Sequence, residues 1–180
     1  MIKTLLLLSC FLSSNAIAAN NTLALKKIHN NVYAIFGQLG DRTSENLGNN
    51  ANFGFIISDK SVVLIDSGAS YQGAKAIHQL IKSVTDKPVR HVINTGGQDH
   101  RWLGNDYFAS HGAQIIASKA AVLDHKKRTE AQFDRLNRSI GADKLKQTKA
   151  RYADIQFEDK YLLKAGSTTV QIIHPGAAHT

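Results

Sequence analysis

The chain has 180 residues, of which 43% are apolar and 20% are charged, with 22 Lys and Arg against 14 Asp and Glu. This size and composition describe one globular domain and exclude a disordered polar chain, a collagen and a coiled coil. No apolar run is long enough to span a bilayer, so a stable membrane span is not expected.

The first 18 residues have the pattern of a secretory signal peptide. Lys3 precedes an apolar run centred on Leu5 to Leu8, and Ala16-Ile17-Ala18 provides an A-x-A cleavage site. We therefore predict a signal peptide over 1–18, cleavage after Ala18, and a single mature domain over 19–180 that is periplasmic or secreted.

A second cleavage route is also present in the sequence. Leu7-Leu8-Ser9-Cys10 resembles a bacterial lipobox, in which Cys10 would become an acylated first residue, although the apolar segment before it is very short. Cleavage after Ala18 would leave no Cys in the mature chain, which then has no disulfide and no thiol nucleophile.

The remaining elements alternate between strands and helices. We predict strands over 24–28, 32–36, 52–57, 61–66, 89–93 and 114–117, helices over 71–85, 102–110 and 119–140, and a final meander of strands over 155–158, 161–163 and 168–173. The stretch 37–50 is rich in Gly and Asn and is long enough to be a mobile flap over a site. These elements predict an α/β (α+β) fold with helices packed on a mixed sheet.

The positive charge is spread along the chain. Its densest part is the predicted helix over 119–140, where basic residues are mixed with acidic ones and Phe133 is the single aromatic residue. We therefore interpret these basic residues, including Arg135, as a solvated helix face and expect no nucleic-acid partner.

Two loops that follow buried strands carry candidate functional residues. Asp99-His100 follows the strand over 89–93, and the last segment of the chain contains His174 and His179. A carboxylate and an imidazole suit Zn²⁺ or Fe²⁺ if a third ligand converges on them. The alternative is that Asp99 caps the next helix and His100 forms a hydrogen bond nearby. The other histidines have no evident partner, so structural or solvated roles are expected for them.

The order of these motifs resembles the metallo-β-lactamase superfamily. The matching segments are Val63-Leu64-Ile65-Asp66-Ser67-Gly68, Asn94-Thr95 with Asp99-His100 and Gly104-Asn105, and Gly176-Ala177-Ala178-His179-Thr180. The resemblance implies an αββα sandwich, here incomplete at the C-terminus, and the chemistry of a metal-bound hydroxide that attacks an ester, lactam or thioester.

The resemblance also implies roles for individual residues. Asp99 and His100 match ligands of the second metal, His179 matches a ligand of the first, and Asp66 matches a strand-end residue that supports the ligand loop. Asp99 would in addition orient the attacking water or accept its proton, and His174 is a possible further ligand.

Two leading histidines of the family motif N-T-H-x-H-x-D-H are absent. Asn94 to His100 is one residue shorter than that motif, and neither alignment places a His at either leading position. The family's remaining second-metal ligands come from a segment beyond the match to Thr180. We therefore expect zinc binding that is weak or incomplete.

Two functional hypotheses remain at this point. The first is an exported metal-dependent hydrolase acting on a small-molecule substrate. The second is a non-catalytic periplasmic binding or interaction module, or an inactive fragment of such a hydrolase, that uses the same strand-end cavity.

Overall fold

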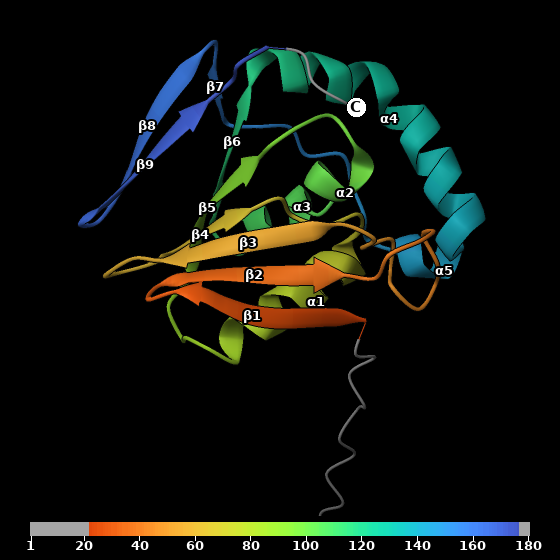
Figure 1. Ribbon diagram of the computed structural model, residues 1–180. Helices are drawn as coiled ribbons and strands as arrows, with labels where there is room; N and C mark the ends of the chain where they lie inside the picture. The colour runs from red at the N-terminus through yellow and green to blue at the C-terminus, as the bar shows by residue number, and fades with distance from the viewer. Residues whose placement is uncertain (1–21, 177–180) are drawn as a thin grey trace, which may run out of the picture.

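The computed structural model describes residues 22–176, and a seven-stranded sheet dominates it (Figure 1). The strands lie in chain order: β1 (Leu23–His29), β2 (Val32–Gly37), β3 (Asn52–Ile57), β4 (Val62–Ile65), β5 (Val89–Asn94), β6 (Gln114–Ser118) and β7 (Ile155–Phe157). Pairing is antiparallel from β1 to β4 and parallel from β4 to β7. The predicted mixed sheet is confirmed.

Hydrophobic pattern explains the position of each strand in the sheet. β4 reads Val-Val-Leu-Ile, and Val62, Val63 and Leu64 are fully buried because layers cover both faces of this central strand. β1 carries Lys26 and Lys27 on an exposed edge, and charged side chains there discourage pairing with another chain.

Helices cover one face of the sheet. α1 (Tyr71–Lys82) buries Ala74, Ile77 and Ile81, which recur at helical spacing, and the side chain of Ser70 caps its first turn by accepting a hydrogen bond from the Gly73 N–H. These residues share a core with α3 (Asn105–Ser110) and with the apolar face of the sheet.

A two-stranded sheet covers part of the other face. β8 (Lys160–Ala165) and β9 (Thr168–Ile173) pair with each other, and Leu163 and Ala165 pack against Val63, Ile93 and Ile116. The predicted meander is therefore wrong in part, since β7 joins the large sheet beside β6. The apolar side of the β8–β9 hairpin covers the large sheet. β8 therefore pairs with β9 and not with β7.

The predicted helix over 102–110 is observed over 105–110, and a separate short helix precedes it. α2 (Asp99–Trp102) and α3 are separated at Gly104, where an added Cβ would collide with the carbonyl oxygen of Ser67. The close approach of these two backbones explains both the glycine and the break.

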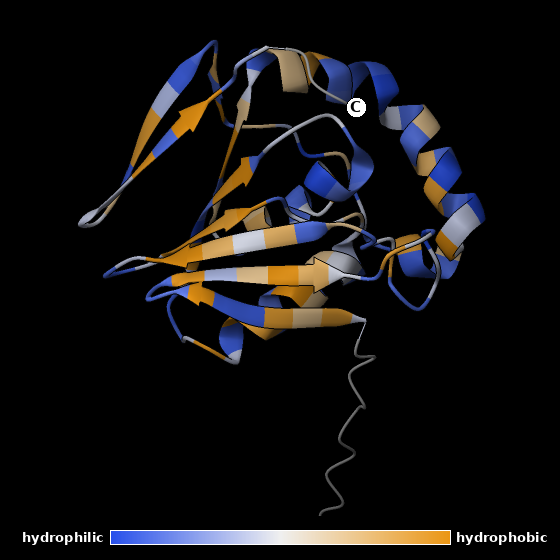
Figure 2. Ribbon diagram, in the orientation of Figure 1, coloured by the Kyte–Doolittle hydropathy of each residue, from blue (hydrophilic) through white to orange (hydrophobic). Residues whose placement is uncertain are grey.

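Two helices follow β6. α4 (Lys119–Ile140) runs from the end of β6 around the outside of α2 to the short helix α5 (Ala142–Leu145) (Figure 1). α4 is largely hydrophilic (Figure 2), yet it buries His125, Gln132, Leu136 and Ile140 at spacings of a helical stripe.

The layers of the described chain are helices, large sheet and hairpin, in that order, and a second helical layer is not seen within residues 22–176. The predicted α/β fold class is confirmed. None of the helices in this part of the chain combines the length and the apolar character needed to cross a membrane.

Candidate functional site

The candidate residues gather where β4 and β5 end. Asp66 follows β4 directly and has a positive φ of 62°, a backbone conformation that is uncommon for a residue with a side chain. Its carboxylate accepts hydrogen bonds from the Thr95 N–H and the Thr95 hydroxyl, both at 2.7 Å, and from Nη1 of Arg101 at 3.0 Å. Asp66 therefore holds the loop that carries Asp99 and His100.

Burial dominates the electrostatics of Asp66. Desolvation raises its pKa to about 6, although the hydrogen bonds from Thr95 and the charge of Arg101 act in the opposite direction. Backbone hydrogen bonds also join the segment after β4 to α2. The Ser67 N–H donates to Arg101 O at 3.1 Å, and the Gly68 N–H donates to His100 O at 3.0 Å.

A pair of buried amides closes the base of this loop. Nδ2 of Asn94 donates to Oδ1 of Asn105 at 3.0 Å, and Nδ2 of Asn105 donates to Oδ1 of Asn94 at 2.9 Å. Asn94 also donates to Arg101 O and Asn105 to Arg151 O. Both motif asparagines thus donate to backbone carbonyls, one in α2 and one in the later chain, and join these segments to the end of β5.

Asp99 is fully buried and lies between two arginines. Its Oδ1 accepts hydrogen bonds from Nη2 of Arg42 at 2.5 Å, from Nε of Arg42 at 3.2 Å and from the His100 N–H at 2.8 Å. Its Oδ2 accepts from Nη2 of Arg135 at 2.9 Å. Burial alone would raise the pKa of Asp99, but the charges of Arg42 and Arg135 outweigh it and hold this pKa below its usual value.

His100 is bonded on both sides of its ring. Nη2 of Arg42 lies 3.1 Å from Nδ1, and because a guanidinium only donates, Nδ1 is the acceptor. Nε2 then carries the proton and donates to Oε1 of Gln98 at 3.2 Å. Burial lowers the pKa of His100 to about 4, so this imidazole is neutral at pH 7.

Helix α4 holds the loop from the outside. Nε1 of Trp102 donates to Oε1 of Gln132 at 2.8 Å, and Nε2 of Gln132 donates to Gly97 O at 2.7 Å. The ring of His125 stacks on Trp102 with centroids 4.5 Å apart, and its Nε2 donates to Gly96 O at 2.8 Å. His125 therefore has the structural role expected of it.

The loop over 37–50 brings Arg42 to this site. Asn49 anchors it to the start of α1, because its Oδ1 accepts from the Ala69 N–H at 3.1 Å and its Nδ2 donates to Gly73 O at 3.1 Å. The loop thus covers the candidate site as predicted, and its mobility stays a prediction.

The other predicted site residues lie elsewhere or outside the described residues. His179 lies outside the described residues, and so does the predicted signal peptide. The His174 N–H donates to Asp159 O at 2.8 Å, and within residues 22–176 its side chain forms no hydrogen bond. The structure therefore brings together Asp66, Asp99 and His100 and does not add His174 to them.

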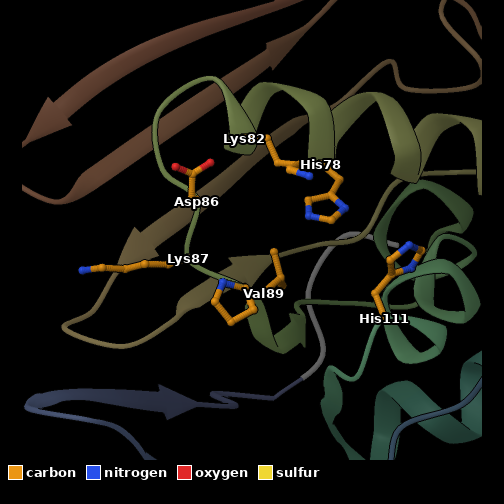
Figure 3. Close-up of a pocket in the computed structure, with 7 residues that line it drawn as sticks. His78, Lys82, Asp86, Lys87, Val89 and His111 are labelled. Carbon is orange, nitrogen blue, oxygen red and sulfur yellow. The ribbon is translucent and has the colours of Figure 1, made fainter.

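A separate hollow of about 230 Å³ lies at the opposite end of the parallel strands (Figure 3). His78, Lys87 and His111 line it beside Val89, the first residue of β5, whereas Asn94 at the other end of β5 belongs to the candidate site. This hollow is therefore distinct from the site around Asp99.

The described residues fit a metal poorly at Asp99. Both carboxylate oxygens of Asp99 and both ring nitrogens of His100 are bonded to protein groups, and two guanidinium charges stand where a cation would bind. Between residues 22 and 176, no three His, Cys, Asp or Glu side chains converge as a metal site requires. A zinc ion would have to displace Arg42 and Arg135 first.

Neither of these two arginines was predicted to lie at the site. Arg42 lies in a loop without regular structure. Arg135 was predicted to lie on a solvated helix face; its side chain is 42% exposed but also donates to the buried Asp99. The usable signal was weak: Arg135 comes three residues after the buried Gln132, so it lies on the side of α4 that faces α2.

Comparison with known proteins identifies a solved structure with a similar fold. No protein-family model matches the chain. Among solved structures, the chain is similar to a metallo-β-lactamase from Pontibacter korlensis, with a TM-score of 0.66 and 15% sequence identity over 88% of this chain. The match spans 63% of that protein's length. At this identity the similarity concerns the backbone, and the chain therefore has a metallo-β-lactamase-like fold.

Proposed function

We propose that the protein binds a small molecule beside Asp99, where β4 and β5 end, and does not hydrolyse it through a metal-bound hydroxide. One observation carries this proposal: Arg42 and Arg135 occupy the two oxygens of the buried Asp99 carboxylate. A carboxylate held in this way positions two guanidinium groups for a ligand and is not available to a cation. The signal-peptide pattern of residues 1–18 supports a periplasmic or secreted location.

The fold similarity favours a second candidate, a metal-dependent hydrolase of esters, lactams or thioesters. That reaction would need Asp99 and His100 to leave their present partners and bind zinc together with further ligands. The two candidates thus differ in what Asp99 does.

Turnover measurements separate them. The purified protein is assayed with a chromogenic cephalosporin and with an acyl thioester in the presence of excess Zn²⁺. We expect rates equal to those of buffer containing the same Zn²⁺. Zinc-dependent turnover that Asp99→Asn abolishes, and that the exposed Asp143→Asn leaves intact, would establish the hydrolase instead.

A further inference from the structure

Positive charge exceeds negative charge around Asp99. Arg42 and Arg135 bring two guanidinium charges to one carboxylate, and Arg101 brings a third, which Asp66 shares. Guanidinium groups stay protonated at any working pH, so the excess is permanent. The cluster therefore has the charge to hold one further anion.

These arginines also have hydrogen-bonding capacity left. A guanidinium carries five N–H donors. Arg135 uses Nη2 on Asp99, while its Nε is buried and has no hydrogen-bond partner in the described part of the chain. The Arg135 side chain is 42% exposed, so the donors that Asp99 does not use remain available to an acceptor from solvent.

Solvent reaches all three arginines. Their side chains are exposed by 17% at Arg42, 32% at Arg101 and 42% at Arg135. They come from three separate segments, which are the loop over 37–50, α2 and α4. A ligand that bound here would contact the edge of the sheet where α/β folds commonly keep their binding sites.

We propose that Arg42, Arg101 and Arg135 form a binding site for an oxyanion, the carboxylate or phosphate group of a small-molecule ligand, beside Asp99. This inference rests on the proposed function and specifies its ligand class. The planar fork of a guanidinium matches both groups, and the charge-assisted hydrogen bonds that result are stronger than neutral ones. Asp99 holds the two forks in place and is not itself a contact of the anion.

Calorimetric titration of the metal-free protein tests the site. Inorganic phosphate and malonate are added separately at constant ionic strength, with sodium chloride as the reference. We expect one of them to bind in a 1:1 ratio with a submillimolar Kd, and the anion that binds distinguishes a phosphate from a carboxylate ligand. Arg135→Gln should weaken binding at least tenfold, and Arg135→Lys should also weaken it because Lys lacks the fork.

Arg138→Gln is the matched control, since Arg138 lies on the same helix, is exposed and carries the same charge. Its affinity should stay within twofold of the wild type. The inference fails if neither anion binds, or if Arg138→Gln weakens binding as much as the Arg135 variants do. If Arg135→Gln does not fold, Arg135→Lys decides, because it keeps the charge next to Asp99. Failure of anion binding together with absent zinc-dependent turnover would leave the proposed function standing.

Discussion

Arg135 donates a 2.9 Å hydrogen bond to Oδ2 of Asp99, a residue 36 positions earlier in the chain. Arg42 binds the other carboxylate oxygen from the loop over 37–50. The buried carboxylate therefore joins that loop, α2 and α4 at one point. Loss of either arginine should lower the free energy of unfolding and change the arrangement of the site.

Arg42→Gln should lower the free energy of unfolding by about 2 kcal/mol. Removing one partner of a buried ion pair leaves a poorly compensated charge, and the cost is moderated here because Arg135 still contacts Asp99. Urea denaturation measures the change, and Arg138→Gln should stay within about 0.5 kcal/mol of the wild type.

The same measurement on a double-mutant cycle isolates the pair. Asp99→Asn alone leaves Arg42 and Arg135 close together without the carboxylate between them. In Arg42→Gln/Asp99→Asn the combined loss should fall short of the sum of the single losses by about 1 to 2 kcal/mol. Strict additivity would show that the ion pair contributes nothing to folding.

Gln132→Leu should destabilise the protein by about 3 kcal/mol. The variant leaves two buried groups without partners, the indole N–H of Trp102 and the carbonyl of Gly97. Gln79→Leu in α1 is the control, because Gln79 is exposed and should tolerate the change. Thermal unfolding followed at the single Trp reports both the stability and the environment of Trp102. Equal stability of the two variants would contradict the bonding described for Gln132.

Acid should destabilise the fold through His125. Burial lowers its pKa to about 4 in the native protein, against 6.5 for an ordinary histidine. Between these values the unfolded chain binds a proton that the native state does not, so the free energy of unfolding falls as pH falls from 6.5 towards 4. The expected loss from this residue is about 2 kcal/mol between pH 7 and pH 5.

His125→Gln should remove this part of the pH dependence, because Gln can donate to Gly96 O but does not titrate. His100 and Asp66 also titrate in this range, and their contributions cancel when the two proteins are compared. Urea denaturation at pH 7 and pH 5 gives the difference. Parallel pH profiles for wild type and variant would rule out His125 as a source of acid sensitivity.

Local patterns were sufficient to predict most of the fold. The β-branched run of β4 and the helical stripe of α1 follow from short-range periodicity, and both elements appear where these patterns place them. The position of β7 was not predictable in this way, because its pairing with β6 bridges the whole of α4. The hairpin of β8 and β9 is set by which sheet face needs covering, a property of the assembled fold.

The candidate site was predictable only in part for the same reason. Asp66, Asp99 and His100 follow buried strands, and ends of neighbouring parallel strands meet at one edge. Arg42 and Arg135 reach that edge from a loop and from a helix of low hydrophobicity, and no spacing rule links them to Asp99. A buried carboxylate needs partners, but the sequence does not say which cations supply them.

Export predicts a defined first residue. With Lys3, the apolar run and Ala16-Ile17-Ala18 acting as a signal peptide, the mature protein should begin at Ala19. N-terminal sequencing of protein from the periplasm or the culture medium checks this. Recovery of a lipid-modified Cys10 as the first residue would indicate a membrane-tethered lipoprotein.

Zinc affinity tests most directly whether Arg42 and Arg135 have taken the place of a metal at Asp99. Metal-free protein is titrated with Zn²⁺ by calorimetry, in parallel with His100→Ala and His179→Ala. We predict binding weaker than about 1 µM, since the donors of Asp99 and His100 are already bonded within the protein. Binding tighter than about 1 µM, equivalent to roughly 8 kcal/mol, that both substitutions abolish would show that these residues form a metal site and would contradict the account.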